Sequence, residues 1–233
     1  MMNKKWKEFQ KLSEKCYLSM AGSKGDKECW NKAFEVLKEI IANGRNEQAE
    51  YGAELYLLDE DTDYCYDVQG WLEDYLDELD VREAHEKLLE VCDELIGMFQ
   101  WKEDSPSNIK FLKSSTLNAM GRKDDAAEFC RQWLADEADS VAAVAANIYA
   151  DIAIQDLDAA GQLIKQHIHE ETQCTEENDI LFTAASTYYQ VIGNKKEKER
   201  IDQALEAYEE YLEGYLMGDE DDDLMWEEGL PFN

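Results

Sequence analysis

The chain has 233 residues, and its 54 Asp and Glu against 23 Lys and Arg give a formal net charge of −31 at pH 7. Phosphate groups are bound by clustered cations, so this charge argues against nucleic acid or an anionic membrane surface as a partner, and it permits a basic protein or peptide. With only two prolines and 44% apolar residues, the composition favours long helices around an ordinary apolar core over a sandwich of short strands.

The cysteines are spread singly, and none forms a C-x-x-C pair. We therefore expect reduced thiols that pack as small apolar groups, not the disulfide framework of a small secreted domain. No segment approaches the ~18 apolar residues of a membrane span, and the stretch from Met1 to Met20 lacks the apolar region of a signal peptide. These observations predict a cytoplasmic protein. The cysteines are Cys16, Cys29, Cys65, Cys92, Cys130 and Cys174.

The first predicted helix is basic, unlike the rest of the chain. Residues 1–45 hold ten Lys and Arg against six Asp and Glu, and the lysines surround Trp6, Phe9 and Leu12. This helix could bind an acidic partner. We expect it instead to dock within the chain, because the acidic remainder of the same molecule is always at hand.

Apolar residues spaced three and four apart predict helices nearly everywhere, as in the run Ala84, Leu88, Val91, Cys92, Leu95. Turn and loop residues divide this pattern into about ten or eleven helices. The expected longest interior loop is Lys102 to Ser107, with Ser105 as a possible cap and Pro106 in the first turn of the next helix. The other predicted breaks are Gly22 to Gly25, Asn43-Gly44, Asp59 to Asp63, Leu79-Asp80, Gly121-Arg122, Gly193-Asn194 and Gly218.

One turn carries a repeat signal. The segment from Gly121 to Ala126 places a helix-ending glycine just before an alanine at the buried face of the next helix, and Ala160 follows Ala126 by 34 residues. This resembles the turn and the period of tetratricopeptide repeats. Asp80 to Ala84 looks like the same turn, whereas lysines follow Gly193 where the alanine would stand.

The resemblance implies an all-α fold, a right-handed α-α superhelix (solenoid) of antiparallel helix hairpins with degenerate repeats. It covers residues 64–217 best, and we assign 1–217 to the repeat domain and 218–233 to an acidic tail. An irregular helical bundle without true repeats is the alternative. The resemblance also implies a concave groove that binds a protein or peptide segment. Its groove positions correspond to Asn108, Ser115, Asn118, Tyr149, Thr183 and Thr187.

Candidate chemical sites are weak. His167-x-His169 with Cys174 lacks a fourth zinc ligand, and we expect a helix end there. The run Asp59 to Asp63 begins like a calcium loop but has Tyr64 and Gly70 where glycine and glutamate belong.

Catalytic motifs are equally weak. Asp124-Asp125-x-x-Glu128 matches an aspartate-rich motif of terpenoid synthases without the second metal motif. No nucleophile motif or phosphate loop occurs in the sequence. We predict no metal, no cofactor and no enzymatic activity.

The segment 218–233 holds seven acids and no base, which is typical of a solvated tail. Its apolar residues Trp226, Leu230 and Phe232 do not suit plain solvation, so we expect them to dock on this chain or on a partner. The leading function is a peptide-binding scaffold. The alternative is an acidic decoy that binds a basic protein and loses its affinity at high salt. The oligomeric state stays open.

Overall fold

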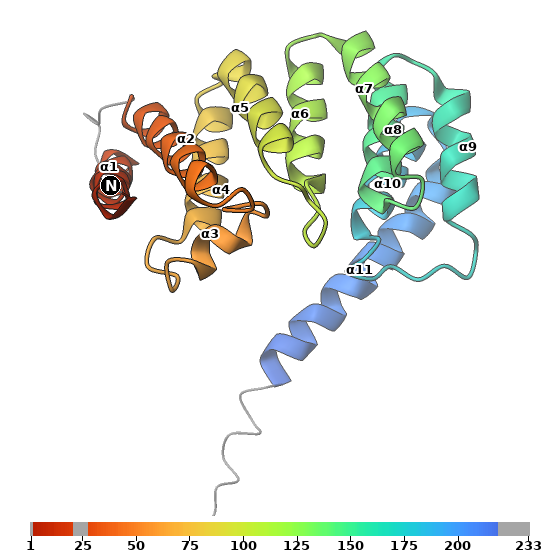
Figure 1. The fold of residues 1–233 in the computed structure, drawn as a ribbon. Helices are drawn as coiled ribbons and strands as arrows, with labels where there is room; N and C mark the ends of the chain where they lie inside the picture. The colour runs from red at the N-terminus through yellow and green to blue at the C-terminus, as the bar shows by residue number, and fades with distance from the viewer. Residues whose placement is uncertain (1, 21–27, 219–233) are drawn as a thin grey trace, which may run out of the picture. The chain divides into compact units, whose positions relative to one another are not determined.

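The computed structural model describes residues 2–20 and 28–218, and these form eleven α-helices and no strand (Figure 1). The all-α prediction and the expected number of helices are confirmed. None of the described helices is long and apolar enough to cross a membrane. The helices are α1 (Met2–Met20), α2 (Cys29–Glu47), α3 (Tyr56–Glu60), α4 (Val68–Val81), α5 (His85–Met98), α6 (Ser107–Ala119), α7 (Lys123–Asp136), α8 (Val141–Ala153), α9 (Leu157–His167), α10 (Asp179–Val191) and α11 (Lys195–Gly218).

The chain divides into two compact units, residues 1–116 and 117–233. The core of unit 1 is rich in aromatic rings. Trp30 of α2 stacks on Trp71 of α4 with ring centroids 5.4 Å apart, and Phe9 of α1 meets Trp71 edge-on at 5.0 Å. Trp6 stacks on Tyr66 at 4.7 Å. Large aromatic side chains bury much apolar surface each, so these contacts fix α1, α2 and α4 to one another.

Helix α1 docks within unit 1, as expected, but mainly through its apolar face. Trp6, Phe9 and Cys16 are buried. Lys5 reaches Glu39 of α2 at 2.6 Å. The other lysines of the helix lie exposed on its outer side, so apolar burial and not charge attraction is the main contact; they are Lys4, Lys7, Lys11 and Lys15.

The predicted end of the second helix at Asn43-Gly44 is wrong, because α2 continues to Glu47. Gly44 is buried inside the helix, and a Cβ there would overlap the ring of Tyr51. The glycine therefore permits a close approach and does not end the helix.

The prediction for the longest loop is also wrong. The segment 168–178 between α9 and α10 is longer than the loop before α6. Pro106 lies directly before Ser107, and its carbonyl oxygen accepts the Lys110 N–H at 2.9 Å. A break between α3 and α4 is confirmed, but it spans residues 61–67, so Asp59 and Glu60 belong to α3.

Unit 2 is built around α8, which contacts α7, α9 and α10. Most of its residues are buried, so this alanine-rich helix packs at the centre of the unit. Small residues also allow close packing elsewhere in the unit. Ala126 and Ala160 are fully buried, and Gly161 of α9 lies against the Tyr188 hydroxyl of α10.

One turn recurs between four helix pairs: α4 and α5, α6 and α7, α8 and α9, α10 and α11. In each, a residue with positive φ precedes the next helix: Glu83 (55°), Gly121 (76°), Gln155 (64°) and Gly193 (73°). In each, the following N–H donates to a carbonyl five residues back: Ala84 to Leu79, Arg122 to Leu117, Asp156 to Asp151 and Asn194 to Tyr189, at 2.8–3.0 Å. This is the hydrogen bond of a Schellman-type helix end.

The recurring turn corrects the predicted correspondence between two repeats of this chain. Ala84 is the N-cap of α5, so its equivalent in the next turn is Arg122, the N-cap of α7. The residue equivalent to the buried Ala126 is Leu88. The turn at Asp80 to Ala84 has the same backbone connection as the turn at Gly121, but its alanine stands four residues before the position equivalent to Ala126.

Candidate functional site

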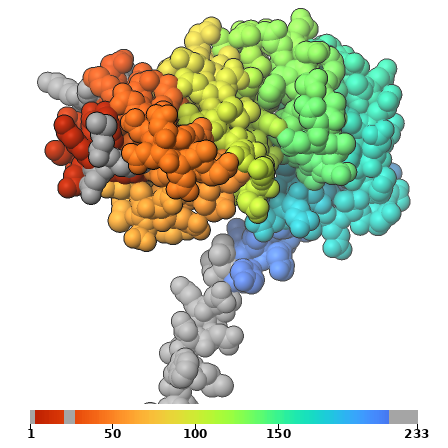
Figure 2. All heavy atoms as spheres, in the orientation of Figure 1, coloured from red at the N-terminus to blue at the C-terminus, as the bar shows by residue number. Residues whose placement is uncertain are grey.

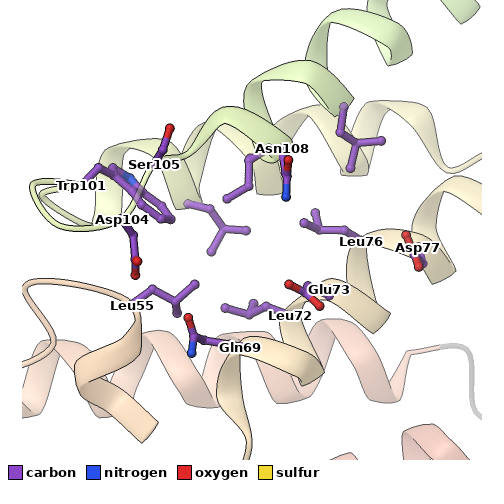
Figure 3. A pocket seen from close by; sticks show the side chains of 13 residues that line it. Leu55, Gln69, Leu72, Glu73, Leu76, Asp77, Trp101, Asp104, Ser105 and Asn108 are labelled. Atoms are coloured by element: carbon purple, nitrogen blue, oxygen red, sulfur yellow. The ribbon is translucent and has the colours of Figure 1, made fainter. Parts of the chain in front are cut away.

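A pocket of about 600 Å³ opens in unit 1 between α4 and α6 (Figure 3). One wall is a stripe of α4, and the facing wall consists of α6 with the loop before it. Its lining residues are Leu55, Gln69, Leu72, Glu73, Leu76, Asp77, Leu95, Trp101, Asp104, Ser105, Asn108, Ile109 and Leu112.

Helix α4 can form this wall because it is apolar on two sides. Trp71 and Tyr75 point into the aromatic core. Leu72 and Leu76 follow each of them by one residue, which turns them by about 100° around the helix axis toward the pocket. Both leucines are buried. The pocket floor is therefore continuous with the core of unit 1 and rests on a firmly packed helix.

The loop at 99–106 is tied down by buried polar contacts. Glu54 is only 5% exposed, and its carboxylate accepts the Lys102 N–H at 3.1 and 3.2 Å. The Gln100 N–H donates to the Ala53 carbonyl at 2.7 Å. Arg45 donates to the Met98 carbonyl at 2.8 Å. These contacts hold the loop, and with it Trp101, at one end of the pocket.

The side chain of Trp101 is held in the same way. Its indole Nε1–H donates to the Ile96 carbonyl at 3.1 Å, and the residue adopts a positive φ of 53°. A non-glycine residue in this conformation is kept there by surrounding contacts. The ring is thus presented as a fixed apolar wall beside Leu55.

The pocket has an apolar floor and an acidic rim. Leu72, Leu76 and Leu95 are buried, whereas Glu73 and Asp77 are exposed and stand above them on α4. Asp104 adds a third carboxylate from the loop, and the described lining holds no Lys, Arg or His. An apolar concavity with a few placed polar groups is the usual form of a binding site. The three carboxylates, with no base among the described lining residues, give the rim a negative potential.

Of the predicted groove residues, Asn108 lines this pocket and is exposed. Ser115 lies two turns further along α6, is exposed, and donates to the Leu112 carbonyl at 2.9 Å. It does not line the pocket. Asn118 belongs to unit 2, and its side-chain Oδ1 is buried without a hydrogen-bond partner in the described structure.

The remaining groove candidates come together in unit 2. Tyr149 of α8 lies close to Thr187 of α10; burial raises the pKa of Tyr149, and the Thr187 hydroxyl lowers it in part. Thr187 donates to the Thr183 carbonyl at 3.1 Å, and Thr183 itself is exposed. The three residues form a small polar patch on two neighbouring helices.

Sequence reasoning missed every other lining residue of the pocket. One signal was available in α4, because Leu72 and Leu76 form a second apolar face beside the face that packs into the core. The loop wall had no signal, since Trp101 is fixed by a partner, Ile96, and by contacts of its loop with distant residues.

The acidic run at Asp59 has a structural role. Asp59 is 1% exposed, and its carboxylate accepts the N–H groups of Val68 at 2.6 Å and Gln69 at 3.1 Å. It thereby satisfies free donors at the start of α4. His167 ends α9, as expected for a helix end. Across the described residues, no three His, Cys, Asp or Glu side chains are grouped to hold a metal ion.

The described cysteines are free thiols, and four of the six are buried. Burial raises the pKa of the Cys92 thiol to about 12, which keeps it protonated near neutral pH. Cys65 departs from the prediction, because it is exposed.

The tail residues Trp226, Leu230 and Phe232 lie outside the described part of the chain. Comparisons of the sequence with protein-family models and with curated proteins, and of the structure with solved structures, each give no match.

Proposed function

We propose that this protein is a peptide-binding scaffold whose ligand occupies the pocket between α4 and α6. The observation that carries the proposal is the pairing of a leucine floor with three carboxylates at the rim. The ligand class is a protein segment that places an apolar side chain beside a Lys or Arg.

The recurring turn supports a repeat architecture for this scaffold. Four helix pairs with the same backbone connection are what degenerate tetratricopeptide-like repeats would require. In such an array α4 and α6 would be the first helices of two successive pairs, which are the helices that line the groove of a solenoid. Asn108 then keeps its predicted role as a groove residue.

The test is binding of a library of short peptides that vary an apolar residue and a flanking charge. Leu-Lys and Phe-Arg pairs should be enriched over the same peptides with glutamate in place of the base. Neutralising the rim with Glu73→Gln and Asp77→Asn should weaken binding of the basic peptides. Both side chains are exposed, so the fold should tolerate the changes. Asp80→Asn, on an exposed α4 position outside the pocket, is the matched control.

The apolar contribution is tested by Trp101→Ala, because removal of this wall should weaken binding at every salt concentration. Raising salt from about 0.1 M to about 1 M shortens the screening length from ~10 Å to ~3 Å. If binding vanished over this range and did not respond to Trp101→Ala, the proposed binding in the pocket would be contradicted and an acidic decoy favoured.

A further inference from the structure

Unit 2 has a second hollow, of about 620 Å³, along the last helix. One wall is the apolar side of α11, and the other is the loop segment from Thr172 to Glu176. The α11 wall follows helical spacing, since its residues are three and four apart: Ala204, Ala207, Tyr208, Tyr211 and Leu212.

The apolar side of α11 continues past the hollow and stays open. Tyr211 is 66% exposed, Tyr215 is 64% exposed and Leu212 is 38% exposed. The C-terminal turns of this helix extend away from the other helices of unit 2 (Figures 1 and 2). An open stripe of two tyrosines and a leucine on so acidic a chain indicates a contact surface.

The facing loop is preorganised. Asn178 accepts the Thr175 N–H at 2.9 Å through its Oδ1 and donates to the Gln173 carbonyl at 3.0 Å. The Thr172 hydroxyl accepts the His169 N–H at 2.9 Å. The loop is therefore a fixed wall, and an occupant need not order it on binding.

We propose that residues 224–226 of this same chain, Leu-Met-Trp, bind in this hollow. They are the first apolar residues after α11. A helix rises about 1.5 Å per residue, so Tyr211 and Tyr208 lie roughly 10 and 15 Å before the helix end at Gly218. The five residues 219–223 reach about 17 Å when extended, which is enough to return the chain to that level.

Charge repulsion opposes this contact, because the docking segment and its surroundings are both acidic. The glutamates of the last turns, Glu206, Glu209, Glu210 and Glu213, lie on the opposite side of α11 from the apolar stripe. Glu176 of the loop wall and Asp179 approach Tyr208, whose pKa is raised by partial burial and by these carboxylates. The acidic residues 219–223 would lie near them. Apolar burial therefore holds the segment against like-charge repulsion, and added salt should tighten the contact.

The experiment compares the emission of Trp226 in full-length variants. Subtracting the spectrum of Trp226→Phe from that of the unchanged chain isolates this tryptophan. Acrylamide is the quencher, since it is neutral and is not repelled by the acidic chain. The expected result is blue-shifted emission that is shielded from acrylamide. The shielding should be greater at about 1 M salt than at about 0.1 M, because the screening length falls from ~10 Å to ~3 Å and the repulsion weakens.

The double substitution Tyr211→Ser and Leu212→Ser should shift the emission to the red and increase its quenching severalfold. Both positions are exposed, so unit 2 should keep its fold, as helical circular dichroism would verify. Leu18→Ser, at a position of unit 1 that is 73% exposed, is the matched control and should change nothing. A Trp226 that is fully quenched in the unchanged chain, or an emission unaffected by the groove substitutions, would overturn the proposal.

Binding to a second copy is distinguished by mixing. The chain with Tyr211→Ser and Leu212→Ser carries Trp226 but lacks the apolar wall of the hollow. The Trp226→Phe chain carries the intact hollow but lacks the tryptophan. A blue shift on mixing these two chains, or an emission that depends on protein concentration, would overturn docking within one chain.

Discussion

Two buried carboxylates show how differently one residue type can act at the scale of single residues. Asp59 accepts two backbone N–H groups at the start of α4. Asp151 of α8 is 3% exposed, and its Oδ1 lies 3.6 Å from the Arg131 guanidinium. The first carboxylate completes a helix, whereas the second is held in a poorly solvated position.

Asp59→Ala should lower the free energy of unfolding by about 1–3 kcal/mol, because the buried Val68 N–H and the partly buried Gln69 N–H lose their acceptor. Urea unfolding measures the effect. Asp61→Ala changes an exposed acid of the same segment and should have little effect. Equal losses for the two variants would show that Asp59 acts only through its charge.

Asp151 predicts a dependence of stability on pH. Burial raises its pKa above the ordinary 3.8, Arg131 lowers it in part, and Asp156 raises it. The folded state therefore holds this proton more tightly than the unfolded state, so the stabilisation is complete below 3.8 and is lost as pH rises through the higher folded pKa. Asp151→Asn should gain stability relative to the unchanged chain across that window and keep a constant advantage above it.

The measurement for Asp151→Asn is urea unfolding at a series of pH values, with the exposed Asp139→Asn as control. A difference between Asp151→Asn and the unchanged chain that does not vary with pH would mean that the folded pKa is not raised.

Ala126 and Ala160 test close helix packing. Each is fully buried, so Ala126→Leu and Ala160→Leu should each cost about 1–3 kcal/mol through overpacking. Thermal unfolding reports the change, and Ala135→Leu at an exposed position of α7 should be nearly neutral. Unchanged melting temperatures for both buried variants would contradict the assigned register.

At the scale of elements, the four recurring turns differ in one respect. Two have glycine at the positive φ, and two have Glu83 and Gln155 there. No neighbouring atom lies within 4 Å of a Cβ placed at Gly121 or Gly193, so the cost of a side chain is a backbone cost alone. This conformation costs an L-residue roughly 1–2 kcal/mol.

The positive φ at these turns predicts opposite effects on stability for replacing glycine and for introducing it. Gly121→Ala and Gly193→Ala should destabilise by about 1 kcal/mol, and Glu83→Gly and Gln155→Gly should be neutral or stabilising. Chemical denaturation of the four variants supplies the comparison. Destabilisation by all four would mean that side-chain contacts of Glu83 and Gln155 outweigh their backbone strain.

The same turns show what the sequence could reveal. Gly121 and Gly193 marked helix ends correctly because glycine is favoured at positive φ. Gln155 adopts this conformation without such a marker, and Gly44 was misread because its close contact with Tyr51 depends on the packed structure. Asn108 was predicted from the repeat register and lines the pocket, but the loop wall at Trp101 depends on contacts distant in sequence. Local chemistry is visible in a single sequence, whereas tertiary contacts are not.

At the scale of the whole molecule, the net charge of −31 sets the response to salt. Self-repulsion of a highly charged chain opposes its compact state. The described ion pairs are mostly at the surface, where each contributes little. Raising salt from about 0.01 M to about 1 M shortens the screening length from ~30 Å to ~3 Å and should raise the urea midpoint. A lower midpoint would show that attractive pairs dominate.

The stacked rings of unit 1 also make an internal optical probe. The indoles of Trp30 and Trp71 lie 5.4 Å apart at an interplanar angle of 28°, with Tyr75 stacked on both. Transition dipoles at this separation couple, and the coupled excitations split into circular dichroism bands of opposite sign. The couplet requires α2 and α4 to be in contact. Loss of the couplet during unfolding would report the separation of α2 and α4 in unit 1 without an attached label. The helical signal, in contrast, reports on both units together.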